Sequence, residues 1–250
     1  MGEIFAVMSG KGGVGKSTVA ANTAACFEKS GKKVLLFDAD LCLRNLDIIL
    51  GLTDSTVWDI EDVFKGRCAF EDAVLSAGKH KNLFLLKAPA VPVNDTEKIT
   101  DFIVETALSN KDSYDFIIID CPSGLNAEIR KFMRRGIGTI LVTTPDFTAI
   151  SDASRTAEAA YKAGAGDVKL IINRINALMI KKDFAPNFDE IIDGTHTQLL
   201  GLIPDDPRIG AYANRGILVS DLRKSFSKKA FENISNRLLN IDTELYEFWK

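Results

Sequence analysis

Short apolar runs recur along the chain, and each ends at a polar or turn-forming residue. They lie at 4–8, 34–37, 83–86, 116–119, 140–142, 170–172 and 200–203. None alternates apolar with polar positions, so each run predicts a strand that is buried on both faces. Apolar residues at helical spacing fill most of the intervals, over 16–29, 95–109, 124–134, 147–162, 205–213 and 222–247.

Buried strands that alternate with helices predict an α/β fold. We expect a single doubly wound, mostly parallel sheet with helices on both faces. The sequence has no repeat, low-complexity linker or clear boundary, so we expect one domain over residues 1–250. Ligands of such sheets bind at the carboxyl ends of the strands. Asp38 and Asp120 each end a predicted strand and therefore belong at that edge.

A glycine-rich segment joins the first predicted strand to the first predicted helix. Residues 10–17 read GKGGVGKS and fit the pattern G-x-x-x-x-G-K-[ST]. The glycines let backbone N–H groups surround phosphates, Lys16 supplies charge to the β- and γ-phosphates, and the Ser17 hydroxyl ligates Mg²⁺. The following helix directs its positive N-terminus at the anion. The residues expected to bind ATP or ADP here are Gly10, Gly12, Gly13, Val14, Gly15, Lys16, Ser17 and Thr18.

Two acidic segments follow strands that we expect beside this loop. Residues 38–47 read DADLCLRNLD, and residues 120–126 read DCPSGLN. A strand-end carboxylate near a phosphate loop can hold a water of the Mg²⁺ shell, and a second one can orient the attacking water. The residues expected to hold Mg²⁺ are Ser17, Asp38 and Asp120.

The loop and both acidic segments resemble those of the MinD/ParA superfamily of deviant Walker A ATPases, and most closely its MinD branch. The feature specific to that superfamily is a second lysine, Lys11, inside the loop ahead of Lys16. The resemblance implies that Lys11 reaches across a dimer to the partner's nucleotide and stabilises phosphate charge there. It also implies that Asp40 and Asn45 arrange the attacking water. The expected catalytic residues are therefore Lys11, Lys16, Asp40 and Asn45.

The chain departs from the MinD pattern at three positions. Cys42 stands where MinD-like proteins usually have glycine, Ser123 where they have alanine, and Asn126 where they have an acidic residue. Glycine permits backbone geometries that cysteine does not, so we expect a different local conformation at Cys42. Without the acid at 126, we expect a change in how Lys11 is held.

Two further segments resemble the adenine side of the family's site. Asn173 and Arg174 follow a predicted strand, and an Asn side chain can both donate to and accept from an adenine edge. Residues 204–207 would form the facing loop, with Pro204 and Asp206 as contacts. A plain strand-end turn is the alternative. Asp152 is either a favourable charge near a helix start or part of the dimer and partner surface.

The C-terminal region, 222–250, predicts an amphipathic helix followed by a short acidic tail. Its apolar face either packs on the protein's own sheet or meets a membrane. The last ten residues carry three carboxylates against one lysine, so they repel anionic lipid, and the basic anchor typical of MinD is not found. The apolar positions are Phe231, Ile234, Leu238, Ile241, Leu245 and Phe248.

Residues 222–238 also carry a modest excess of basic side chains over a single acidic one, Glu232. ParA-type relatives bind DNA backbone nonspecifically through basic residues in this region. The alternative is a solvated helix face. The basic residues are Arg223, Lys224, Lys228, Lys229 and Arg237.

Composition narrows the class of protein. A net charge of −3 gives no global attraction to nucleic acid or membrane, and 46% hydrophobic with 26% charged residues is typical of soluble proteins. The four cysteines have no zinc or iron–sulfur spacing. The sequence shows no secretion signal and no apolar run of about 18 residues. We expect a cytoplasmic protein with free thiols, and leave peripheral membrane association open.

The resemblance implies a slow, partner-stimulated ATPase. It would form a homodimer around ATP and Mg²⁺, bind a regulatory protein or a surface, and release it on hydrolysis, in division-site placement or another positioning task. The nearest alternative is a ParA-type ATPase that binds DNA nonspecifically in plasmid or chromosome partitioning. An iron–sulfur carrier would need paired cysteines, and an ATP-dependent ligase would need a second substrate pocket.

Overall fold

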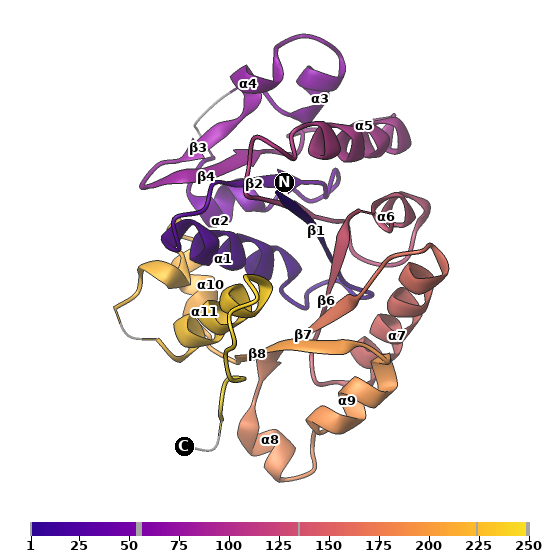
Figure 1. Cartoon of the computed structure of the whole chain (residues 1–250), viewed down its shortest axis with the longest axis vertical. Coiled ribbons are helices and arrows are strands. Elements are labelled where there is room, and N and C mark those ends of the chain that lie inside the picture. Colours follow the sequence, from indigo (N-terminus) through magenta and orange to yellow (C-terminus); the bar gives the residue numbers. More distant parts are fainter. Residues whose placement is uncertain (1, 54–56, 135, 224, 249–250) are drawn as a thin grey trace.

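One sheet organises the protein. The computed structural model describes residues 2–53, 57–134, 136–223 and 225–248. Within these ranges eight strands lie in the order β3-β4-β2-β5-β1-β6-β7-β8 (Figure 1). Neighbouring strands are parallel except β3 and β4, which pair antiparallel. The strands are β1 (Glu3–Met8), β2 (Val34–Asp38), β3 (Leu75–Ala77), β4 (His80–Leu86), β5 (Phe116–Asp120), β6 (Gly138–Thr143), β7 (Val168–Ile175) and β8 (Gln198–Pro204).

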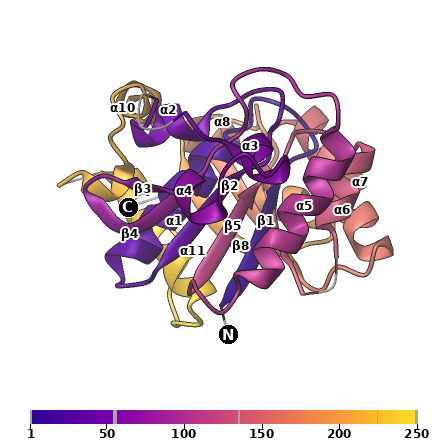
Figure 2. The same cartoon turned by 90° about the horizontal axis from the view of Figure 1, so that it is seen from above.

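Helices cover both faces of the sheet, so each face has its own hydrophobic core (Figures 1 and 2). The core on one face is built with α1 and α11, and the core on the other face with α5, α6, α7 and α9. The helices are α1 (Lys16–Lys29), α2 (Leu46–Leu50), α3 (Ile60–Phe64), α4 (Phe70–Ala73), α5 (Thr96–Ser109), α6 (Ala127–Phe132), α7 (Phe147–Lys162), α8 (Ala177–Lys181), α9 (Phe188–Thr195), α10 (Arg208–Ala213), the 3-10 turn η1 (Val219–Asp221) and α11 (Phe226–Leu238).

The predicted fold class is confirmed. Each of the seven predicted strands is present, and the helices predicted at 16–29 and 147–162 coincide with α1 and α7. The sequence interpretation missed the short edge strand β3 and the short helices α2, α3, α4, α8 and α9. No helix in the described part of the chain is both long and apolar enough to cross a bilayer.

The predicted helix over 222–247 is wrong after Leu238. Helix α11 ends at Leu238, and Asn240 adopts a left-handed backbone with φ of 57°. The N–H of Ile241 donates to the carbonyl of Asn236, and that of Asn240 donates to the carbonyl of Arg237. These paired bonds around a left-handed residue form a Schellman motif, which terminates a helix. Residues 241–247 then continue without helical structure.

The segment after α11 folds back on the protein. Asn233 donates to the carbonyl of Glu244 at 2.9 Å, and Arg237 donates to the carbonyl of Thr243 at 3.0 Å. The half-buried Phe248 ring contacts Phe188 of α9 at a centroid distance of 5.9 Å. Leu245 and Phe248 therefore pack on the protein's own body, whereas Ile241 is 51% exposed. Phe231, Ile234 and Leu238 are buried under α11.

The strand order places three strand ends at one edge. Strand β1 lies between β5 and β6, and β2 lies on the other side of β5. Asp38 and Asp120 are directly paired in register on β2 and β5, and Val7 of β1 pairs with Asp120. The loop that leaves β1 is therefore next to both predicted strand-end carboxylates.

Two glycine backbones touch at the side of this edge. Gly51 follows α2, and Gly216 follows α10. A Cβ atom on Gly216 would lie 2.6 Å from the Cα of Gly51, and Gly216 has φ of +62°. Only glycine allows this approach in this conformation. The contact joins the helix after the first acidic segment to the helix after β8.

Candidate functional site

The loop between β1 and α1 opens the start of a helix toward solvent. Gly13 and Gly15 have φ of +80° and +90°, conformations that favour glycine. Gly15 is the N-cap of α1 and supplies no side-chain hydrogen bond. The first N–H groups of α1 are therefore available to an anion, which the positive end of the helix attracts.

Close packing fixes this loop on both sides. A Cβ on Gly10 would lie 2.3 Å from the carbonyl oxygen of Asp152 in α7. A Cβ on Gly15 would lie 2.4 Å from Nδ2 of Asn173, at the end of β7. A side chain at either position would require the loop or its neighbour to shift. Asp152, which the sequence left between two interpretations, thus supports the loop through its backbone.

Lys16 forms a buried ion pair beneath the loop. Its Nζ lies 2.7 Å from Oδ1 of Asp120, and the side chains are only 7% and 1% exposed. Burial alone would lower the pKa of Lys16, but the Asp120 carboxylate more than offsets this, so the pKa of Lys16 rises. Lys16 is therefore held in its charged form at the opening of the site.

The other oxygen of Asp120 is an orphan. Oδ2 is buried and has no hydrogen-bond partner among the described residues. An unpaired buried carboxylate oxygen is costly, so a partner is expected there. A Mg²⁺ ion with its shell of water suits such an oxygen, because carboxylates and water are its usual ligands. The residues present thus fit a magnesium site.

Asp38 holds the first acidic segment in place. Its Oδ2 accepts hydrogen bonds from the N–H groups of Asn45 and Leu46, both at 3.2 Å, and its Oδ1 accepts one from Asp40. Burial and the charge of Asp120 together raise the pKa of Asp38 to about 7. A nearby cation would favour the charged form of this carboxyl group.

Asp40 and Asn45, the two predicted water-positioning residues, lie in the loop that Asp38 anchors. Oδ1 of Asp40 accepts the Leu43 N–H at 3.0 Å, and Nδ2 of Asn45 donates to the Leu43 carbonyl at 2.7 Å. Cys42, exposed beside them, occupies the glycine position of the pattern without a positive φ. The loop therefore closes through side-chain contacts that do not require glycine.

Lys11 contacts its own chain. Its Nζ donates to Oγ1 of Thr148 at 2.9 Å and lies 3.4 Å from Oδ1 of Asp146. Burial alone would raise the pKa of Asp146, but hydrogen bonds from two threonine hydroxyls, the Ala149 N–H and Lys11 lower the pKa to about 2. Asp146 is also the N-cap of α7. Sequence reasoning missed this contact, because the two partners are 135 residues apart.

A pocket of about 400 Å³ lies over the loop. Of the expected site residues, it brings together Gly12, Gly13, Gly15, Lys16, Ser17, Thr18, Asp40 and Asn45. It also contains residues that the sequence did not assign to a binding site, from both acidic segments, from α2 and from the end of α10. The lining residues that were missed are Ser9, Leu43, Ile48, Ile49, Ser123, Ala213 and Asn214.

A second pocket of about 410 Å³ adjoins the first, and Gly15, Thr18 and Arg174 line both. It brings the four predicted base-side residues together: Asn173, Arg174, Pro204 and Asp206. Both oxygens of Asp206 are occupied, because Arg208 binds them and Ser227 donates to Oδ2. Asp206 thus fixes the shape of its loop.

Asn173 links the second pocket to the first. Its Nδ2 donates to the carbonyl oxygen of Val14 at 2.7 Å. A carbonyl oxygen only accepts, so this contact fixes the orientation of the amide and leaves Oδ1 as the acceptor. Asn173 is 6% exposed.

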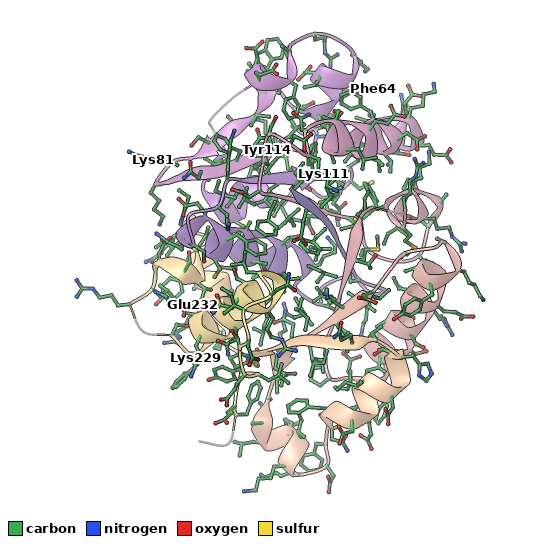
Figure 3. All side chains as sticks on the ribbon, viewed as in Figure 1. Phe64, Lys81, Lys111, Tyr114, Lys229 and Glu232 are labelled. Atoms are coloured by element: carbon green, nitrogen blue, oxygen red, sulfur yellow. The ribbon has the colours of Figure 1, made fainter. Side chains whose placement is uncertain are left out.

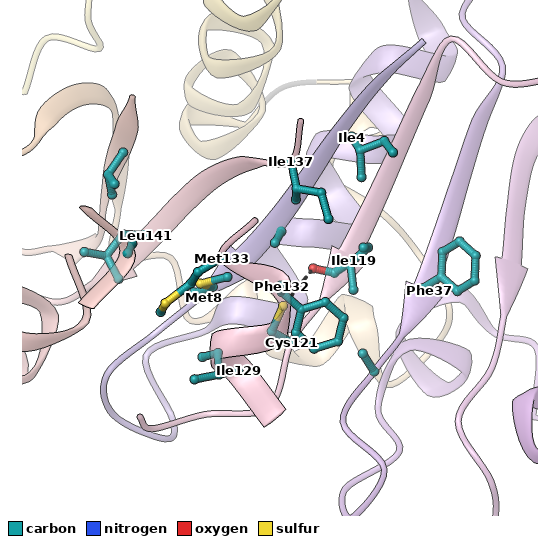
Figure 4. Close-up of a cluster of buried hydrophobic side chains, with 14 of the residues drawn as sticks. Ile4, Met8, Phe37, Ile119, Cys121, Ile129, Phe132, Met133, Ile137 and Leu141 are labelled. Atoms are coloured by element: carbon teal, nitrogen blue, oxygen red, sulfur yellow. Dashed lines mark hydrogen bonds between the residues drawn. The ribbon is translucent and has the colours of Figure 1, made fainter. Parts of the chain in front are cut away.

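The cysteines take no part in either pocket. Cys121 points into the core among Phe132, Met133 and Met8, where its thiol contacts the Ile119 carbonyl (Figure 4). Burial raises the pKa of Cys121 well above its ordinary value. All four cysteines are free, and no group of three or more potential metal-ligating His, Cys, Asp or Glu side chains occurs within the described ranges.

Known proteins match this sequence over almost its whole length. Residues 1–239 match the family described as "ParA: NUBPL iron-transfer P-loop NTPase". The chain is 36% identical over 250 residues to "Septum site-determining protein MinD" of Synechocystis sp., a match that covers 99% of this chain and 93% of that protein. The chain belongs to the ParA/MinD family of P-loop NTPases.

Solved structures of ParA/MinD NTPases show the same fold. The MinD chain in the MinC:MinD cell division protein complex of Aquifex aeolicus superposes with a TM-score of 0.88 at 33% identity, covering 98% of this chain and 99% of that one. MinD of Pyrococcus horikoshii, solved with Mg-ADP, gives 0.82 at 31% identity, covering 95% and 96%. The family resemblance inferred from the loop and the two acidic segments is therefore confirmed.

Proposed function

We propose that this ParA/MinD NTPase binds ATP with Mg²⁺, dimerises across the bound nucleotide and hydrolyses it to switch the binding of a partner. One observation carries the proposal: an uncapped helix start and the charged Lys16 line one pocket, and the carboxylate that binds Lys16, Asp120, keeps one oxygen without a partner among the described residues. Groups that suit the phosphates, the helix start and Lys16, thus lie next to a carboxylate that suits the metal of Mg–ATP. The MinD relatives, one of them solved with Mg-ADP, support the same assignment.

Each residue of the site has a proposed task. The N–H groups of the loop and Lys16 would bind the phosphates, while Ser17, Asp38 and Asp120 would hold Mg²⁺. The metal, when bound, neutralises phosphate charge. Asp40 and Asn45 orient the water that attacks the γ-phosphorus, as the bond to the β–γ bridging oxygen breaks and ADP leaves.

Lys11 from a second copy would complete the phosphate site. Its present contacts, with Asp146 and Thr148, are about half exposed and therefore weak. Exposed apolar side chains at the same edge supply a surface for the second copy, because such groups gain from burial. These side chains are Leu43, Ile48, Leu125 and Phe147.

The regulated partner is proposed to be a protein. One relative, MinD of Aquifex aeolicus, is solved as a complex with MinC. The ParA-type alternative, DNA binding, depends on the basic residues near α11. Arg237 is turned inward to two backbone carbonyls, and Lys228 donates to the Leu222 carbonyl. Lys229 remains exposed beside Glu232 (Figure 3), whereas Lys224 lies outside the described residues.

Light scattering with Mg²⁺ and ATP tests the switch. We expect Asp40→Ala to give a stable dimer, because it binds ATP but positions no water, and Lys16→Ala to stay monomeric. Lys81→Ala, at an exposed lysine on β4 (Figure 3), is the matched control and should behave as the wild type. Identical behaviour of the Asp40 and Lys16 variants would refute the proposal.

The trapped Asp40→Ala dimer is then used to test binding to DNA and to membranes. Duplex DNA and anionic liposomes are added in turn, at low and at physiological salt. We expect neither to bind. Strong DNA binding that weakens steeply with salt would favour the ParA-type alternative.

A further inference from the structure

A serine hydroxyl lies in the wall of the phosphate pocket without an assigned role. Ser123 follows Asp120 by three positions and lines the pocket with Gly12, Gly13 and Asp40. The surroundings of this hydroxyl show what it can contact.

Backbone hydrogen bonds fix the turn that carries Ser123. The N–H of Cys121 donates to the Val7 carbonyl at 3.1 Å, and the N–H of Gly124 donates to the Ser9 carbonyl at 2.9 Å. Val7 lies in β1 and Ser9 directly follows this strand, at the start of the phosphate loop. Ser123 lies between these two anchors, so its position relative to the loop is set by the sheet.

The hydroxyl faces the loop and is open to a ligand. Oγ of Ser123 lies 3.6 Å from the place that a Cβ on Gly12 would take. No hydrogen bond of this hydroxyl is found within the described ranges. Its neighbour in the pocket wall, Ser9, is 1% exposed, and its Oγ is also without a partner there. Buried hydroxyls are normally paired, so this wall has hydrogen-bonding capacity for a ligand.

The arrangement of the two pockets indicates which phosphate of a nucleotide would lie closest to Ser123. The base-side pocket meets the phosphate pocket at Gly15 and Thr18. A nucleotide whose base lies in that pocket extends its phosphates away from this junction. Gly12, Asp40 and Ser123 line the phosphate pocket and not the base-side pocket. ADP would stop short of these residues, and only a third phosphate would reach them.

We propose that the Ser123 hydroxyl donates a hydrogen bond to the terminal phosphate of ATP and so makes the second acidic segment a detector of that phosphate. The inference rests on the proposed ATP site and adds a residue that distinguishes ATP from ADP. A hydrogen bond to a charged acceptor is among the stronger ones in proteins. Its loss should weaken binding of the triphosphate about tenfold or more and leave ADP unchanged.

Calorimetry on three serine variants tests the proposal. Each protein is titrated with Mg-ADP and with Mg–AMP-PNP, a triphosphate that is not hydrolysed. Ser123→Ala removes the hydroxyl, and Ser123→Thr keeps it. Ser113→Ala is the matched control, because Ser113 is exposed and precedes β5 at the opposite edge of the sheet.

Ser123→Ala should bind AMP-PNP about tenfold more weakly and ADP within twofold of the wild type, whereas Ser123→Thr should keep most of the preference. An unchanged preference in Ser123→Ala would overturn the inference, as would equal losses for both nucleotides, which indicate a structural role. A wild-type protein that binds neither nucleotide would instead overturn the proposed function itself.

Discussion

Weakening the contact between Lys11 and Asp146 should change the dissociation constant of the proposed dimer. If Lys11 acts on the partner's nucleotide, it must first leave Asp146 and Thr148 of its own chain. Asp146→Asn removes the charge of the acceptor. Asn is as good an N-cap as Asp, so α7 should keep its start. The change therefore addresses the lysine and spares the helix.

The size of the effect follows from the exposure of the pair. Lys11 and Asp146 are 44% and 45% exposed and 3.4 Å apart. Pairs of this kind contribute about 0.5 kcal/mol. In each dimer both copies of Lys11 would leave Asp146, so the free energy of dimerisation should be about 1 kcal/mol more favourable in the variant. That free energy corresponds to a dimer dissociation constant about fivefold lower.

Sedimentation equilibrium with ATP and Mg²⁺ measures this constant, in an Asp40→Ala background that prevents turnover. Glu158→Gln breaks another exposed ion pair of α7, with Lys162, and is the matched control. We expect no change in that control. A dissociation constant for Asp146→Asn that equals or exceeds that of its parent would contradict the reasoning, because the release of Lys11 from Asp146 would then cost no free energy.

Three further predictions concern stability. The pKa of Asp146 is lowered from its ordinary value of 3.8 to about 2 in the folded state. The charged Asp146 therefore stabilises the folded state at any pH above 3.8, and this contribution is lost as the pH falls through about 2. The stability gap between wild type and Asp146→Asn in urea should therefore be present at pH 5 and close toward pH 2. Gly216→Ala should destabilise by about 1–3 kcal/mol in thermal unfolding, because its Cβ would clash and its φ is positive. Gly210→Ala, with open space around it, should not. Phe248→Ala should cost about 1–2 kcal/mol in urea without changing ADP affinity, whereas Phe226→Ala, 73% exposed, should cost little.

Local patterns predicted the central sheet because its strands are buried on both faces. The apolar run of β5, for example, is uniformly buried and ends at the polar Asp120. The predicted bounds of α7 agree with the observed ones, because Asp146 caps its N-terminal end and the helix ends before Ala163. Strand β3 was missed because it has only three residues, one of them exposed, at the antiparallel edge of the sheet.

The C-terminal error has an identifiable cause. The apolar positions continue at helical spacing past Leu238, so periodicity alone extends the helix. Asn240, a residue that tolerates the left-handed conformation, was the available stop signal. Periodicity also cannot tell which surface a face meets. Leu245 and Phe248 pack on one core, whereas Leu238 belongs to the other.

Sequence motifs predicted the residues of the phosphate loop but not their partners. The pairing of Lys16 with Asp120 and the position of Ser123 against Gly12 follow from the strand order. Lys11 binds Asp146 through a contact between distant segments. Such contacts depend on how β1, β5 and β6 lie side by side, which no local pattern encodes.

The hydrogen bond from Asn173 to the Val14 carbonyl has a consequence for the choice of purine. One of the two N–H groups of the Asn173 amide is engaged by the Val14 carbonyl, and this contact fixes Oδ1 as the acceptor that a base beside Asn173 can meet. Adenine offers an exocyclic amino group that can donate to that oxygen, whereas guanine presents a carbonyl at the same position, and two acceptors repel. We therefore expect the protein to prefer adenine over guanine nucleotides through a side chain that the loop itself holds in place.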